Sequence, residues 1–205
     1  MSKNFLEIKN VTFAVGGKNK VNDVNISIAN EGDIICILGP SGIGKTTMLR
    51  TIAGLEKINQ GEIILKDKVI SSNKIHVEPE KRNIALSFQE NSLFPHYTVD
   101  KNIHLGMKKD STSNKNINSK EIIKILNIEN ILNKYPHQIS AGEAQRASLA
   151  RSIISQPDLL LLDEPLSNVD QSFKEDIQVS LKQLLNKNKI STIVVTHDSY
   201  EAFYL

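Results

Sequence analysis

The amino-acid sequence predicts an α/β protein with a mostly parallel sheet at its core. Three short apolar runs, at residues 34–38, 159–162 and 193–195, have the length and aliphatic content of strands buried on both faces. Helical patterns follow the first two runs, at 46–53 and as an apolar stripe at 173–185 that is expected to pack on the sheet. This alternation of strands and helices is typical of a parallel sheet covered by helices.

More strands are expected in the first half of the chain and helices in the middle. β-Branched content and alternation place these strands at 6–11, 24–29, 62–65 and 84–88. Residues from about 92 to 149 carry few strand signals and are expected to form a helical lobe. Within it, 108–120 is polar and is predicted to be a loop. After the loop, Ile122, Ile125 and Leu126 have the spacing of an amphipathic helix.

Composition narrows the class of protein. The chain is 40% apolar and 23% charged, which is ordinary for a soluble globular protein, and its net charge of +2 does not favour nucleic acid as a partner. Cys36 is its single cysteine and is expected to be a small buried residue in the 34–38 strand. Because no apolar run approaches 18 residues and the first five residues lack a signal-peptide core, we expect a cytoplasmic protein.

A phosphate-binding loop lies between the 34–38 strand and the 46–53 helix. Its glycines allow successive backbone N–H groups to point at phosphate oxygens, and the helix N-terminus favours an anion. Lys45 supplies a positive charge to the outer phosphates, and Thr46 offers a hydroxyl to Mg²⁺. The motif G-x-x-x-x-G-K-[ST] is formed by Gly39, Pro40, Ser41, Gly42, Ile43, Gly44, Lys45 and Thr46, and Thr47 follows it in the helix.

Two acidic residues come directly after the 159–162 strand. The carboxyl ends of parallel strands are where ligands bind in such sheets. Asp163 is therefore placed to hold Mg²⁺ through water, and Glu164 to act as general base on an attacking water. The alternative is a solvated acidic turn, which the presence of Lys45 and Thr46 disfavours.

Residues 135–146 resemble the signature motif of the ATP-binding cassette family. The segment contains Ser140, Ala141, Gly142 and Glu143, with Ala in place of a usual Gly and Glu in place of a usual Gln. The resemblance implies that these four residues complete the ATP site of a partner subunit, so that the working unit is a head-to-tail dimer with ATP sandwiched between two copies. A capping box between Ser140 and Glu143 is the alternative, and both roles are compatible.

The remaining elements of that family occur in the expected order. Gln89 resembles the Q-loop glutamine, which contacts Mg²⁺ and the attacking water, residues 167–170 resemble the D-loop, and His197 resembles the switch histidine that reaches the γ-phosphate. The resemblance covers nearly the whole chain and implies ATP and Mg²⁺ as cofactors.

The family likeness also implies a domain plan. It is a P-loop NTPase core formed by 1–91 and 150–205, with an N-terminal antiparallel β-subdomain and an inserted helical signature lobe at about 92–149. The chain is thus expected to be a single ABC ATPase domain, 1–205, which is short at its C-terminus and has no regulatory domain there.

Residues 76–84 and 88–96 are similar to ATPase subunits of bacterial importers for ferric iron, thiamine, spermidine, sulfate and maltose. This implies an ATP-driven importer motor on the cytoplasmic face of a bacterial membrane. Ferric iron is the favoured solute; thiamine, spermidine or another small solute is the alternative. Residues 89–99 would dock the membrane permease, with Phe94 and Tyr97 as anchors unless they only pack the lobe. A substrate-binding protein would be an indirect partner.

The adenine end departs from the family pattern. The family stacks adenine on an early aromatic residue, and Val15 stands at that position. Phe13, on the same strand face, is a possible substitute; otherwise the base is held by apolar contact alone, and weak or less base-selective binding is expected.

Two other classes of function remain as alternatives. A non-transport cassette protein acting on ribosomes or DNA is disfavoured, because the chain has one cassette and no long coiled-coil insertion. A degenerate, non-hydrolysing subunit is favoured by Val15 and by the short C-terminus. It is opposed by the intact Lys45, Asp163, Glu164 and His197.

Overall fold

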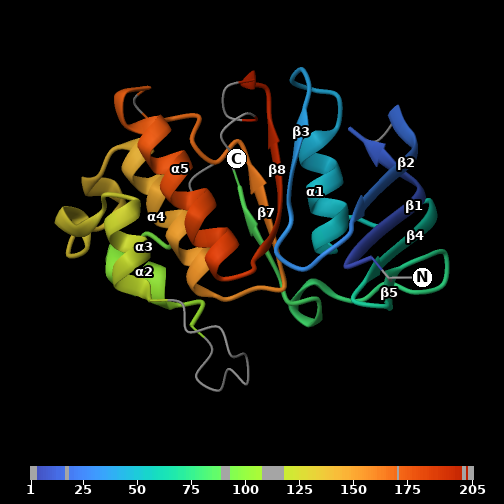
Figure 1. Cartoon of the computed structure of the whole chain (residues 1–205), viewed down its shortest axis with the longest axis horizontal. Coiled ribbons are helices and arrows are strands. Elements are labelled where there is room, and N and C mark those ends of the chain that lie inside the picture. Colours follow the sequence, from blue (N-terminus) through green and yellow to red (C-terminus); the bar gives the residue numbers. More distant parts are fainter. Residues whose placement is uncertain are drawn as a thin grey trace.

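Two four-stranded sheets, with one helix between them, form the frame of the molecule (Figure 1). The computed structural model describes residues 4–16, 19–88, 93–107, 118–169, 171–199 and 202. One sheet is antiparallel, with the strand order β2-β1-β4-β5, and the other is parallel, with the order β3-β8-β7-β6. The structure therefore confirms the predicted α/β fold with a parallel sheet at its core.

The antiparallel sheet contains three predicted strands and one that the sequence did not reveal. Its strands are β1 (Leu6–Val15), β2 (Asn19–Ile28), β4 (Gln60–Leu65) and β5 (Lys68–Ser71). Strand β5 was missed because it has only four residues and because its hairpin turn lacks the usual Asn-Gly or Asp-Gly pair. Lys66 and Asp67 form that turn, with φ angles of 49° and 63°.

The parallel sheet contains β3 (Ile34–Leu38), β6 (Ile84–Ser87), β7 (Leu159–Asp163) and β8 (Ser191–Thr196). Every residue of β7 and β8 is buried, as expected for strands covered on both faces. Alternate residues face two different cores: Leu161 and Ile193 pack with the antiparallel sheet, whereas Leu162 and Val194 pack with the helices on the other side. Cys36 on β3 is half-buried against the second of these cores.

Helix α1 (Lys45–Ala53) lies between the two sheets, and the other helices cover the opposite face of the parallel sheet (Figure 1). These are α2 (Val99–His104), α3 (Ser119–Ile125), α4 (Ala141–Ile154) and α5 (Gln171–Lys187). Short 3₁₀ helices occur at Pro79–Lys81, Glu129–Ile131 and Pro136–Gln138.

The apolar stripe of α5 packs as expected except at its first residue. Ile177, Leu181 and Leu185 are buried, but Phe173 is 54% exposed, so its predicted packing on the sheet is wrong. Phe173 lies at the edge of the buried face of α5. In that first turn the inward position is taken by Lys174, which is only 7% exposed.

A buried arginine holds the C-terminal end of α1. Arg82 is 3% exposed, and its guanidinium donates hydrogen bonds to the oxygens of Ile52 (2.9 Å), Val77 (2.6 Å) and Ser71 (2.9 Å, to Oγ). Burial lowers its pKa to about 10, although the charge of Glu78 acts in the opposite direction. The guanidinium thus satisfies a terminal carbonyl of α1 that would otherwise lack a partner.

We predict that Arg82→Met lowers the free energy of unfolding by about 2–4 kcal/mol, because it leaves buried oxygens without donors. Urea denaturation of the purified protein measures the change. Arg50→Met is the matched control: Arg50 pairs with Glu56 at the surface, and loss of such a pair costs about 1 kcal/mol or less. Equal effects of the two substitutions would contradict the role given to Arg82.

Candidate nucleotide site

The phosphate-binding loop joins β3 to the N-terminus of α1. Gly44 is the N-cap of α1, with a φ of 103°, and no side chain caps this end of the helix. A Cβ at Gly44 would approach the side chains of Val15 and Val21 to 3.1 Å, so glycine is required both for the backbone conformation and for the space. The first N–H groups of α1 therefore remain available to an anion.

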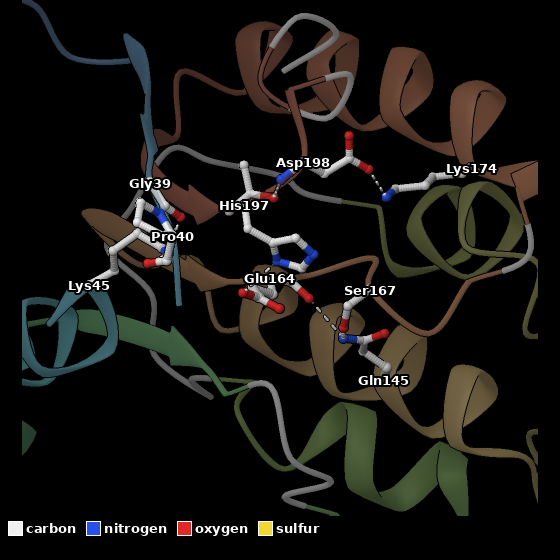
Figure 2. A network of polar contacts seen from close by, with 10 residues as sticks. Gly39, Pro40, Lys45, Gln145, Glu164, Ser167, Lys174, His197 and Asp198 are labelled. Carbon is white, nitrogen blue, oxygen red and sulfur yellow. Dashed lines mark hydrogen bonds and ion pairs between the residues drawn. The ribbon is translucent and has the colours of Figure 1, made fainter. Parts of the chain in front are cut away.

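Lys45 is buried and its side chain folds back over the loop. Its Nζ donates to the carbonyl oxygens of Gly39 (2.6 Å) and Pro40 (2.9 Å), as Figure 2 shows. Two loop carbonyls thus hold the ammonium group at the mouth of the loop. Ile43 projects outward instead and is exposed.

Asp163 is the last residue of β7 and is buried beside the loop. Burial raises the pKa of its carboxyl, and the negative charge of Glu164 adds to this effect. A hydrogen bond with the Thr46 hydroxyl and the charge of Lys45 act in the opposite direction. A carboxylate and a hydroxyl in contact are oxygen ligands of the kind that Mg²⁺ prefers.

The residues present fit Mg²⁺ together with a phosphate. In the part of the chain that the structure describes, no group of three or more His, Cys, Asp or Glu side chains could hold a metal ion. Magnesium sites of nucleotide enzymes commonly use one or two protein ligands, with phosphate and water oxygens as the others. Thr46 and Asp163 match that arrangement.

Glu164 and His197 meet although 33 residues separate them in the chain. The Nδ1 atom of His197 lies 2.8 Å from Oε1 of Glu164, and Figure 2 shows the imidazole ring turned toward this carboxylate. Glu164 is buried, whereas the His197 side chain is half-exposed. The backbone of Glu164 has a φ of 47°, an unfavourable value for a non-glycine residue that is often found at functional sites.

These side chains surround one cavity of about 350 Å³. It brings together residues predicted from four separate segments of the chain. Its lining consists of Val15, Ser41, Gly42, Gly44, Lys45, Thr46, Thr47, Asp163, Glu164 and His197.

Of the two alternatives for the adenine end, the structure excludes stacking on Phe13. Phe13 cannot stack on a base, because it is 2% exposed and its ring packs behind Gly44. Its burial follows from the position of β1 over the loop, where the Phe13 ring lies 3.6 Å from the place that a Cβ of residue 44 would occupy. Val15 is the β1 residue that lines the cavity.

The signature residues form the start of α4. Ser140 is the N-cap, and its Oγ accepts from the backbone N–H of Glu143 (3.2 Å), while Oε2 of Glu143 accepts from the N–H of Ser140 (2.7 Å). The hydrogen bond from the Ser140 backbone is the main cause of a lowered pKa at Glu143. The capping box is therefore present. None of Ser140, Ala141, Gly142 and Glu143 lines the cavity of the same chain.

Two contacts behind the cavity were not predicted. Gln145 of α4 bonds to the segment that follows β7, and Lys174 of α5 forms an ion pair of 2.6 Å with Asp198, next to His197 (Figure 2). The sequence signal that could have indicated both contacts is a polar residue on the buried face of a helix, Gln145 in α4 and Lys174 in α5. Two predicted positions, Gln89 and Asp170, lie outside the described residues.

Comparison with known proteins identifies the class. The sequence model of the ABC transporter family matches residues 21–167, and the chain belongs to this family. It is similar over 97% of its length to the dimeric structure of a post-hydrolysis state of the ATP-binding cassette MJ0796 bound to ADP and Pi. The TM-score is 0.81, the sequences are 30% identical, and the match covers 90% of that chain.

The curated relatives of the chain are ATP-binding proteins of importers. The chain is 37% identical over 98% of its length to the Fe(3+) ions import ATP-binding protein FbpC of Escherichia coli O157:H7. It is 40% identical over 90% of its length to the sn-glycerol-3-phosphate import ATP-binding protein UgpC of Bartonella bacilliformis, and 39% over 98% to the spermidine/putrescine import ATP-binding protein PotA of Haemophilus ducreyi. It spans only 53–57% of the length of these relatives. Among the described residues, no helix is long and apolar enough to cross a membrane.

We predict that Asp163→Asn stabilises the protein in buffer free of nucleotide and Mg²⁺. The neutral amide avoids the burial of a charge, which is the main cause of the raised pKa of Asp163, and it also removes the repulsion by Glu164. The urea midpoint should therefore rise. Asp176→Asn, on the exposed face of α5, is the control and should change stability by about 0.5 kcal/mol or less. A lower midpoint for Asp163→Asn than for the unmodified protein would contradict this account.

Proposed function

We propose that the chain binds ATP with Mg²⁺ and hydrolyses it in a site shared by two copies. One observation carries this proposal: Lys45, Thr46, Asp163, Glu164 and His197 converge on one cavity at the carboxyl edge of the parallel sheet. A phosphate-binding loop, an oxygen ligand pair and a carboxylate-histidine pair are the parts that phosphoryl transfer to water needs.

In this proposal each side chain has a separate role. The loop amides and Lys45 hold the outer phosphates and offset the charge that develops on them. Thr46 and Asp163 hold Mg²⁺, which supplies further positive charge to the phosphates. Glu164 accepts the proton of the attacking water, and His197, held by its contact with Glu164, donates toward the γ-phosphate. Gln89 is proposed, from the family likeness, to contact Mg²⁺ and the water.

A second copy of the chain completes the site. The segment Ser140–Glu143 stands apart from the cavity of its own chain, with Ser140 and Ala141 exposed at the start of α4. In a head-to-tail dimer this exposed start would meet the nucleotide of the partner. The dimeric arrangement named for the MJ0796 structure supports this proposal.

We further propose that this ATPase drives a membrane importer from the cytoplasmic face of a bacterial membrane. The names of the relatives support import, and ferric iron is the proposed solute because FbpC proteins are among the relatives. Glycerol phosphate and spermidine are alternatives on the same grounds. A substrate-binding protein would act with the permease.

The domain plan is part of the same proposal: a single domain, with a core formed by 1–91 and 150–205 and a helical lobe at about 92–149.

The permease would dock on residues 89–99, of which 93–99 are described. Phe94 is 47% exposed, and its ring lies beneath the guanidinium of Arg151, with 5.7 Å from Cζ to the ring centroid. Phe94 and Arg151 also line an open groove of about 530 Å³, together with Leu86 and Leu105. Tyr97 contacts the Phe94 ring edge to face and is less exposed, which favours Phe94 as the main anchor.

We predict that Glu164→Gln lowers kcat for ATP hydrolysis about a hundredfold or more, because the amide cannot accept the proton of water. ATP affinity should stay within a few-fold, since the phosphate contacts are unchanged. Phosphate release measures the rate, and binding of a fluorescent ATP analogue measures affinity. Lys45→Ala is the complementary variant and should lose binding. Near-normal turnover of Glu164→Gln would rule out the proposed base, and inactive unmodified protein would favour the non-hydrolysing alternative.

We predict that Phe94→Asp releases the protein from the membrane fraction of its native host. The substitution would replace the contact of the Phe94 ring with the permease by a charge that is costly to bury. ATPase activity of the purified variant should be unchanged. Leu55→Asp, which changes an equally exposed apolar residue beyond the C-terminus of α1, is the control and should remain membrane-bound. Equal retention of the two variants in the membrane fraction would contradict the docking surface.

A further inference from the structure

Gln145 bonds to three points of one loop. The loop comprises residues 164–169, between β7 and α5. The Nε2 atom of Gln145 donates to the carbonyl oxygen of Glu164 (2.9 Å) and to Oγ of Ser167 (3.1 Å), and its Oε1 accepts from the backbone N–H of Asn168 (3.0 Å). Gln145 is only 3% exposed, so these hydrogen bonds lie in an environment that is largely protected from solvent.

Gly142 brings the same helix into direct contact with the loop backbone. Gly142 precedes Gln145 by three residues and so lies on the same face of α4. A Cβ at this position would lie 2.4 Å from the carbonyl oxygen of Asn168. Two residues of α4 therefore contact the backbone of Asn168: Gln145 accepts a hydrogen bond from its N–H, and Gly142 packs against its carbonyl oxygen.

The other end of the loop carries the proposed general base. The backbone N–H of Glu164 donates to the carbonyl of Val195 on β8 (2.9 Å), and its own carbonyl accepts from Gln145. Glu164 is thus fixed between the sheet on one side and α4 on the other, in a left-handed conformation that is unfavourable for a residue other than glycine. Such a conformation persists only where its surroundings hold it.

We infer that Gln145 is a positioning residue that sets Glu164 for catalysis by locking the 164–169 loop to the start of α4. The inference rests on the proposed ATPase function and deepens it. Because the start of α4 would face the nucleotide of the partner copy, the same contacts join that nucleotide mechanically to the Glu164 of this chain. Each copy would then adjust its own base in response to ATP held at the other site.

Gln145 acts here without touching the nucleotide. It does not line the cavity, so its removal leaves the phosphate contacts of the loop in place. Its removal also leaves the carbonyl of Glu164 and the N–H of Asn168 without this partner, which allows the loop to shift. Displacement of a catalytic group by about 1 Å can lower a rate about a hundredfold.

The test compares two buried glutamines changed in the same way. Gln145→Met should lower kcat for ATP about tenfold to a hundredfold, with KM within twofold, and should bring the Hill coefficient for ATP close to one. Gln178→Met is the matched control: Gln178 on α5 is equally buried, and its Nε2 has no partner among the described residues. It should leave kcat, KM and the Hill coefficient unchanged.

A milder change guards against misfolding of Gln145→Met. Ser167 is exposed and shares one of the three bonds, so Ser167→Ala should fold normally and lower kcat a few-fold with unchanged KM. When Gln145→Met and Ser167→Ala are combined, the decrease in log kcat should be smaller than the sum of the two single decreases, because the two residues act through the same contact.

The outcomes separate this inference from the function on which it rests. An active unmodified protein whose kcat and Hill coefficient survive both Gln145→Met and Ser167→Ala would overturn the positioning role and leave the ATPase proposal intact. Additive losses in the double variant would also overturn it. An inactive unmodified protein would overturn the ATPase proposal, and the positioning role would fall with it.

Discussion

The site depends on the burial of helix α1 between the two sheets. Leu49 and Ile52 anchor its length in the core, and Arg82 holds its C-terminal end. At its other end Gly44 presses against β1, and no side chain caps the helix. The N-terminus of α1 is thereby held at the carboxyl edge of the parallel sheet, and no side chain accepts a hydrogen bond from its first backbone N–H groups. This arrangement attracts phosphate.

The same geometry gathers charges that are costly to bury. Strands β3, β7 and β8 are parallel neighbours, so the residues that follow them meet at one edge although they lie far apart in the chain. Two adjacent carboxylates, Asp163 and Glu164, are buried there, and the raised pKa of Asp163 expresses the cost. In the proposed function, this loss of stability is the cost of a site that holds a cation and phosphates.

The sequence predicted which residues line the cavity better than it predicted the contacts behind them. Short motifs specify the loop and the acidic pair, because few residue types can perform those roles. Phe13 and Phe173 were misplaced because period alone does not distinguish the core face from its edge, and tertiary packing decides between them. The contacts of Gln145 and Lys174 were missed because a long polar side chain finds its partner only through the fold.

In the proposed function, half of the nucleotide site comes from a second copy of the chain. Sedimentation velocity of Glu164→Gln, with and without Mg-ATP, tests it most directly. A monomer is expected without nucleotide and a dimer with it, and a monomer under both conditions when Ala141→Asp is added to place a carboxylate at the exposed start of α4. A Glu164→Gln protein that binds ATP and stays monomeric, or a dimer that Ala141→Asp does not disturb, would show that the second copy does not complete the site.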